Sequence, residues 1–327
     1  MREYLLGIDV GGTNTKVGLF SAEGQLCDKR SFPTRTTGDP LCFSDLMGAC
    51  DAILASCCLA RIDVSAIGIA LPGIIDAHGS LLLCPNIDLD LRSYQDHLAD
   101  FFPGICVVVL NDANAAALGE RWQGSAVGVD DFLLVTLGTG IGGGLVQGGV
   151  LCVGSHGAAG ELGHVCVCPT ETEMCSCGRY GCLEQYASGT GLVHNAHRQM
   201  TREEGAQATS SLSCLATVTA KDVFDHARAG DRVALAAVSD FVRFLGFGLA
   251  QIACVVDPRL IVVGGGLSAS APWYLDDLVC AYRRYALPIC QDTSLAAAQL
   301  GGECGIFGAA AFAREALRSS MGDFWTQ

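Results

Sequence analysis

The densest set of potential metal ligands in the sequence lies between His164 and Glu184. One histidine and five cysteines fall within 19 residues that are also rich in glycine. One imidazole and three thiolates are a common tetrahedral ligand set for structural Zn²⁺. The alternative is that these cysteines are reduced thiols buried as small hydrophobic side chains. The spacing predicts a zinc site but leaves open which three thiols bind among Cys166, Cys168, Cys175, Cys177 and Cys182.

Two glycine-rich turns have the composition of phosphate-binding loops. They are Asp9-Val-Gly-Gly-Thr13, after an apolar segment, and Gly138-Thr-Gly140. Glycines let backbone N–H groups approach an anion closely, threonine adds a hydroxyl donor, and Asp9 is suited to hold Mg²⁺ or its water. Either turn alone is equally consistent with a hairpin turn, whereas two at matching places favour phosphate binding. Neither a Walker loop nor a G-x-G-x-x-G fingerprint fits.

Two further side chains near these turns each have two interpretations. Asp112 follows an apolar strand at 105–110 and precedes a helical pattern at 113–121. It is either a helix N-cap, a role that Asn114 could also fill, or a general base at a strand end. Lys16, on the strand after the first turn, is either a phosphate ligand or a solvated side chain.

The elements that must position these residues alternate between strands and helices, which indicates an α/β fold. The first half opens as strand, glycine turn, strand, second turn and strand, and residues 132–150 repeat that order. We interpret this as an internal duplication with a boundary near residue 114. Other elements are predicted as helices at 43–59 and 305–317, as a mainly helical region at 219–254, and as strands at 4–10, 16–20, 66–70, 133–137, 142–146 and 260–263.

Composition excludes several classes of protein. The 327 residues include 20 Lys+Arg and 34 Asp+Glu, for a net charge of −14, which argues against nucleic-acid or anionic-membrane partners. Half of the residues are hydrophobic and 17% are charged, as in a globular protein of about two domains. No signal peptide or membrane span is recognisable, so we expect a cytoplasmic protein whose 18 cysteines are reduced.

Six motifs occur in order along the chain. They are Asp9-x-Gly-Gly-Thr-x-x-Lys16, Asn111-Asp-Ala-Asn-Ala115, Leu137-Gly-Thr-Gly-Ile-Gly-Gly-Gly144, Gly160-Glu-x-Gly-His164, Cys175-x-Cys-Gly-x-x-Gly-Cys-Leu-Glu184 and Val263-Gly-Gly-Gly266. Together these motifs resemble the ROK family, which contains repressors, open-reading-frame proteins and sugar kinases. The resemblance runs from about residue 3 to about residue 315 and is most specific at the cysteine motif.

The resemblance implies a two-domain actin/hexokinase-like ATPase fold, built from duplicated ribonuclease-H-like domains with a cleft between them. The small N-terminal domain would span residues 1–114 and be completed by the helix at about 305–327. The large domain would span 115–304 and carry the zinc insertion at 164–184.

The resemblance also implies a role for each motif. Asp112 would be the catalytic base, and His164 would bind zinc through one ring nitrogen while the other faces the sugar. The remaining zinc ligands would be Cys175, Cys177 and Cys182. The sugar hydroxyls would be held by Asn86, Asn111, Glu161, His164 and Glu184, with Gly73 nearby. ATP and Mg²⁺ would be held by Asp9, Gly11, Gly12, Thr13, Gly138, Thr139, Gly140, Gly264 and Gly265.

Among the activities in this family, the sequence favours a sugar kinase over a sugar-responsive repressor. The first loop begins at Asp9, which leaves no room ahead of it for a helix-turn-helix domain. Residues 182–188 and 83–87 look most like bacterial glucokinases, so glucose is the expected substrate. Kinases for N-acetylmannosamine, N-acetylglucosamine, allose or fructose are the alternatives, and a homodimer is expected from the resemblance alone.

Overall fold

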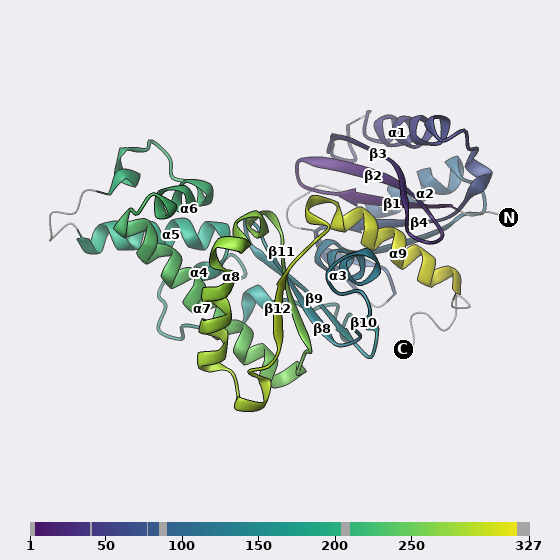
Figure 1. The fold of residues 1–327 in the computed structure, drawn as a ribbon. Coiled ribbons are helices and arrows are strands. Elements are labelled where there is room, and N and C mark those ends of the chain that lie inside the picture. Colours follow the sequence, from purple (N-terminus) through teal and green to yellow (C-terminus); the bar gives the residue numbers. More distant parts are fainter. Residues whose placement is uncertain (1–3, 40, 77, 85–89, 204–209, 319–327) are drawn as a thin grey trace. The chain divides into compact units, whose positions relative to one another are not determined.

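The computed structural model describes residues 4–39, 41–76, 78–84, 90–203 and 210–318. The chain divides into two compact units (Figure 1). Unit 1 comprises Met1–Asp130, Gly144–Gly160 and Gly302–Gln327. Unit 2 comprises Asp131–Gly143 and Glu161–Gly301.

Unit 1 is built on a five-stranded sheet in the order β3-β2-β1-β4-β7. The first three strands, β1 (Tyr4–Val10), β2 (Asn14–Ser21) and β3 (Leu26–Pro33), form an antiparallel meander. The strands β4 (Val64–Leu71) and β7 (Cys106–Asn111) continue the sheet in parallel with β1. Strand β4 is almost entirely apolar, as expected for a central parallel strand covered on both faces. A short hairpin of β5 (Ile74–Ile75) and β6 (Leu81–Leu83) follows β4.

Helices cover both faces of this sheet. The helices α1 (Cys42–Ser56) and α2 (Leu91–Phe101) share one hydrophobic core with the side chains on one face of β1 and β4. The helix α9 (Cys304–Arg318) packs on β1 and β4 from the other side, as Figure 1 shows in yellow. The helix α9 therefore belongs to the same compact unit as the first strands of the chain.

The helix α3 (Asp112–Gln123) also belongs to unit 1, whereas the division expected from the sequence places most of it in the second domain. The reason is its close packing on α9. A Cβ atom on Gly308 would lie 1.6 Å from the carbonyl oxygen of Ala115, so only glycine allows this approach. Residues Gly144–Gly160 join unit 1 as well.

A second five-stranded sheet has the order β10-β9-β8-β11-β12. Its strands are β8 (Phe132–Leu137), β9 (Ile141–Gln147), β10 (Val150–Cys152), β11 (Leu260–Gly264) and β12 (Ser294–Ala297). As in the first sheet, three consecutive strands are followed by two that run parallel to the first of them. The two sheets share one topology, which confirms the internal duplication and the predicted α/β fold.

The helices of unit 2 surround α7 (Arg232–Val256), which contacts α4 (Glu184–Ala187), α5 (Gly189–Glu203), α6 (Ala220–Arg228) and α8 (Ala271–Tyr285). Within the described ranges α7 alone is long and apolar enough to cross a membrane by length and composition. Its most apolar stretch is 61% buried, which is typical of a core helix. Aromatic contacts between Phe224, Phe241 and Tyr274 tie α6, α7 and α8 together.

Candidate active site and metal centre

The first glycine loop joins β1 to β2 and is held by a threonine from the next strand connection. Gly11 N–H donates to the carbonyl of Asn14 at 3.1 Å, which closes the turn. Thr34 donates its backbone N–H to Thr13 O at 2.9 Å and its hydroxyl to Gly11 O at 2.6 Å. Because these two carbonyls are bound by Thr34, the loop has a fixed backbone while Gly12 and Thr13 remain exposed.

Asp9 lies at the carboxyl end of β1 against the start of α9. The pKa of Asp9 is raised to about 6, mainly by burial; the Lys16 ammonium opposes this rise and the Asp112 charge adds to it. Lys16 is half-buried and donates to the carbonyl of Gly302. It therefore faces the start of α9 and Asp9 rather than open solvent. A desolvated carboxylate beside a glycine-rich loop is a suitable anchor for Mg²⁺ or its water.

The space for the Asp9 carboxylate depends on Gly305. A Cβ atom at position 305 would lie 2.5 Å from Asp9 Cγ. We expect Gly305→Ala to lower the melting temperature by at least about 2 °C, because overpacking typically costs about 1–3 kcal/mol. We also expect a higher KM for Mg²⁺-ATP because the carboxylate is displaced. Gly302→Ala is the matched control, since its Cβ would meet only Lys16 Nζ, at 3.5 Å. Equal melting curves and equal KM values for the two variants would contradict this placement.

Asp112 is the first residue of α3, at the carboxyl end of β7. The N-cap of this helix is Asn111, whose Oδ1 accepts from Ala113 N–H at 2.9 Å and from Asn114 N–H at 3.1 Å. The prediction that Asp112 or Asn114 caps the helix was wrong, because Asn111 has the extended backbone of a cap and α3 starts one residue earlier than predicted. Capping is thus the role of Asn111.

The amide of Asn111 also orients Asp112. Its Nδ2 donates to Asp112 Oδ1 at 3.0 Å and to Gly73 O at 2.9 Å. Asp112 is exposed on one side, yet the protein around its carboxylate limits hydration, and this burial raises the pKa of Asp112. The hydrogen bonds from Ala113 N–H and the Asn111 amide act in the opposite direction. A raised pKa makes a carboxylate a stronger base, which suits proton abstraction.

The second glycine loop joins β8 to β9 at the carboxyl end of the second sheet. Gly138 N–H donates to Gly140 O at 3.0 Å, which makes a tight turn like that of the first loop. β11 ends beside this loop, since Gly264 pairs with Thr136. Gly265, at a φ of 82°, lies so close to Leu137 that a Cβ would come within 2.5 Å of its backbone. The structure thus brings Gly138–Gly140 close to Gly264 and Gly265 within unit 2, and both segments are predicted to hold ATP.

The metal-ligand candidates also converge within unit 2. The ligand atoms of His164, Cys175, Cys177 and Cys182 all lie within 4.8 Å of one another. His164 Nδ1 is 3.8 Å from Cys175 Sγ, and the Sγ atoms of Cys177 and Cys182 are 3.7 Å apart. Tetrahedral zinc with bonds of about 2.3 Å to sulfur separates its ligands by about 3.8 Å, so the donor set fits the ion.

The two other cysteines of this region lie outside that group. Cys168 Sγ is 3.7 Å from the hydroxyl of Thr170, and Cys166 is exposed beside Gly181. All 18 cysteines are free thiols in the structure.

Three of the predicted sugar ligands, Glu161, His164 and Glu184, occur around this cluster. His164 Nε2 is 3.9 Å from Glu161 Oε2, so the imidazole turns Nδ1 to the cysteines and Nε2 to Glu161. Glu184 Oε2 accepts from Ile141 N–H at 2.9 Å, which places this carboxylate against the second glycine loop. Asn86 lies outside the described residues.

The sequence analysis missed the residues whose hydrogen bonds to loop carbonyls fix the two glycine loops. Thr34 does so in unit 1, and Gly189 and Thr190 do so in unit 2. Each is a threonine or a glycine far along the chain from the loop that it contacts, and it belongs to no sequence motif that would have identified it.

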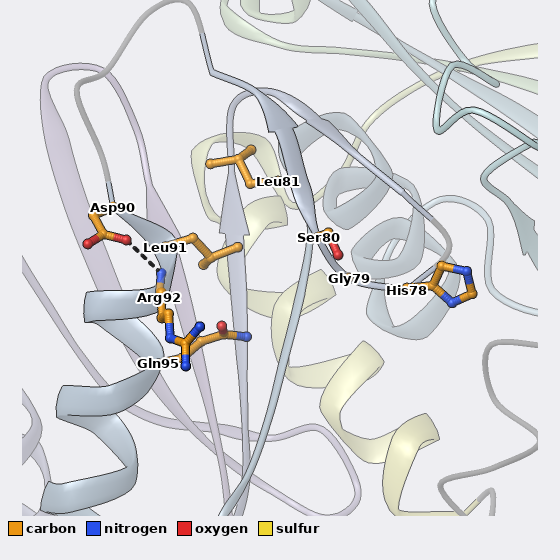
Figure 2. Close-up of a pocket in the computed structure, with 8 residues that line it drawn as sticks. All are labelled: His78, Gly79, Ser80, Leu81, Asp90, Leu91, Arg92 and Gln95. Carbon is orange, nitrogen blue, oxygen red and sulfur yellow. Dashed lines mark hydrogen bonds between the residues drawn. The ribbon is translucent and has the colours of Figure 1, made fainter.

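Unit 1 also has a polar pocket of about 480 Å³, between the β5–β6 turn and the start of α2 (Figure 2). Asp90 accepts there from Arg92 N–H at 3.1 Å, as the N-cap of α2. None of the predicted site residues lines this pocket, which is formed by His78, Gly79, Ser80, Leu81, Asp90, Leu91, Arg92 and Gln95.

Comparison with known proteins shows the family of this chain. The ROK family profile matches residues 5–316. The chain belongs to the ROK family. This ROK chain is 36% identical over 308 residues to a glucokinase of Halalkalibacterium halodurans, with 93% of each chain covered. It is 32% identical over 314 residues to an N-acetylmannosamine kinase of Escherichia coli, covering 94% of this chain and 98% of that one.

A solved ROK structure is similar to this chain over nearly its whole length. The ROK glucokinase of Streptomyces griseus, in complex with glucose and AMPPNP, is 34% identical to this ROK chain and matches with a TM-score of 0.77. The match covers 95% of this chain and 99% of that one. The chain therefore has the actin/hexokinase-like fold of ROK sugar kinases.

Proposed function

We propose that this chain is an ATP-dependent hexokinase that converts glucose to glucose 6-phosphate. Two observations carry the proposal. Each glycine loop is fixed by hydrogen bonds from a distant part of the chain, and Asp112 is oriented by Asn111 at the end of a strand. The glucokinase of H. halodurans and the glucose complex of the S. griseus enzyme support glucose as the acceptor.

In the proposed reaction, Asp112 accepts the proton of the sugar 6-hydroxyl as that oxygen attacks the γ-phosphorus of ATP. The new oxygen–phosphorus bond forms while the bond to the ADP oxygen breaks, and ADP leaves in line with the attacking group. The N–H groups of the glycine loops would stabilise charge on the phosphates, and Asp9 would hold Mg²⁺ or its water, which neutralises phosphate charge when bound. Asn111 keeps the Asp112 carboxylate in one orientation.

We also propose that His164, Cys175, Cys177 and Cys182 hold a structural Zn²⁺. The ion would supply no reacting group, and its contribution is to fix the tautomer and direction of His164. The ring would then present Nε2, beside Glu161, to the sugar hydroxyls. Glu184 and Asn86 complete the proposed sugar ligands.

Substrate preference gives the direct test of the proposed function. In a coupled ATP-dependent assay we expect the highest kcat/KM with glucose among glucose, mannose, fructose, allose and both N-acetylhexosamines. A pocket that hydrogen-bonds hydroxyls loses about 1–3 kcal/mol when one polar contact is unpaired, which is a preference of roughly 5–150-fold. A higher kcat/KM with N-acetylmannosamine would instead favour the activity of the E. coli relative.

Two properties of the whole protein complete the proposal. The net charge of −14 supports an enzyme without nucleic-acid or anionic-membrane partners, and we propose a cytoplasmic location, where the cysteines outside the zinc group stay reduced. The family resemblance supports a homodimer of the 34.0 kDa chain, which light scattering after size exclusion would test.

A further inference from the structure

The chain that follows the last cysteine of the metal cluster passes directly behind the second glycine loop. Cys182 is followed two residues later by Glu184 at the start of α4, and Gly189 and Thr190 open α5. We refer to residues 184–190 as the brace segment. All of its contacts described below lie within unit 2.

Four hydrogen bonds join the brace segment to the loop, and the longest of them runs from Thr190 N–H to Thr139 O at 3.5 Å. Gly189 N–H donates to Gly138 O at 2.7 Å. The hydroxyl of Thr190 donates to Thr139 O at 2.9 Å. Glu184 Oε2 accepts from Ile141 N–H at 2.9 Å. Gly140 packs so closely on the brace segment that a Cβ at this position would lie 2.2 Å from Glu184 Oε2 and clash with it.

These bonds determine which way the loop presents its donors. The C=O and N–H of one trans peptide point in opposite directions. Since the carbonyls of Gly138 and Thr139 point at the brace segment, the N–H groups of Thr139 and Gly140 point away from it. Consecutive N–H groups facing one side form an anion-binding concavity. The brace segment therefore orients the donors that would receive a phosphate.

The opposite end of the brace segment reaches the metal cluster. Ser176, between the ligands Cys175 and Cys177, donates its hydroxyl to Glu184 Oε1 at 3.5 Å. One carboxylate thus contacts the cysteine turn through one oxygen and the glycine loop through the other. Glu184 is therefore in contact with both the metal-binding turn and the glycine loop.

We propose that Glu184 and Thr190 are positioning residues for the nucleotide phosphates, and that the metal-binding turn sets the affinity of the loop for ATP through Ser176. This inference rests on the proposed kinase function and extends it, because it connects a structural metal site to nucleotide binding. Glu184 is also a proposed sugar ligand, so the tests use Thr190 and Ser176.

The first test is Thr190→Val, which keeps a β-branched side chain at an exposed position and removes the hydroxyl donor. We expect the Kd for AMPPNP, measured by calorimetry, and the KM for ATP to rise roughly fivefold to tenfold, as for one lost hydrogen bond. The KM for glucose and the zinc content should stay within twofold of wild type. Thr190→Ser should restore nucleotide affinity.

The matched control is Thr201→Val on the same helix. Its hydroxyl donates to His197 O at 3.0 Å, within α5, and it should leave the AMPPNP Kd unchanged. The second test is Ser176→Ala, which removes the link from the cysteine turn without removing a metal ligand. We expect it to weaken AMPPNP binding in the same direction while zinc content stays at the wild-type level.

Wild-type AMPPNP affinity in both Thr190→Val and Ser176→Ala would overturn the inference. Loss of zinc from Thr190→Val would overturn it too, because the hydroxyl would then support the metal site rather than the loop. Failure of the wild-type protein to bind AMPPNP or to phosphorylate any sugar is a separate result that rejects the kinase function itself.

Discussion

Replacing Asp112 by asparagine is expected to lower kcat by about 10²–10⁴-fold, the usual contribution of a general base. The amide is nearly isosteric and accepts the same N–H donor from Ala113, but it cannot take a proton from the sugar hydroxyl. Glucose affinity, measured by calorimetry, should therefore stay close to that of the wild type. A variant that keeps its kcat would remove Asp112 from the role of base.

The same substitution should raise the melting temperature at neutral pH. Burial raises the folded-state pKa of Asp112, so the charged carboxylate destabilises the folded protein at pH values above that pKa. The destabilisation disappears as the pH falls below the unfolded-state pKa of about 3.9, where both states are protonated. The difference in melting temperature between Asp112→Asn and wild type should thus shrink from pH 8 towards pH 4.

Asp96→Asn, at an exposed position on α2, is the matched control for both measurements. It should change neither kcat nor the pH dependence of the melting temperature. If it matches Asp112→Asn in stability, the gain reflects the overall negative charge of the protein rather than burial at position 112.

The second large effect is expected at the metal cluster. Cys177→Ser should reduce bound zinc from about one ion per chain to nearly none, because structural zinc sites release about 10–16 kcal/mol on binding through a complete ligand set. We expect a lower melting temperature and at least about a 100-fold loss of kcat/KM, since His164 loses its fixed orientation. Elemental analysis, thermal denaturation and the coupled assay measure the three effects.

Cys166→Ser is the control that the structure provides, because this thiol lies in the same segment but outside the four-ligand group. It should keep zinc, stability and activity. Retention of a full zinc equivalent by Cys177→Ser, or its loss from Cys166→Ser, would contradict the ligand assignment.

Local patterns were sufficient to predict most helices and strands. Apolar runs that end in glycine turns, such as the one before Gly138, predict a strand because both signals lie within a few residues. The predicted N-cap of α3 was wrong. Asn111, Asp112 and Asn114 are all good cap residues, and only the backbone conformation distinguishes them.

Features that depend on distant contacts could not be predicted from the residues alone. The sequence offered five thiols, and selecting Cys175, Cys177 and Cys182 requires the fold of the segment. The assignment of α3 to unit 1 depends on α9, which is nearly 200 residues further along the chain. Thr34 and Thr190 show the same limitation, since a hydroxyl that fixes a loop has no sequence pattern of its own.

The position of α9 also affects how the protein reaches its native state during synthesis. The face of β1 and β4 that α9 covers is made among the first 71 residues, whereas α9 begins at Cys304. At about 5–20 residues per second, a ribosome needs roughly 12–50 s to complete the intervening chain. During that time Phe20 lacks its partner Phe307, and one side of the nascent sheet remains uncovered. Chaperone binding to ribosome-bound chains should therefore persist until α9 has been synthesised.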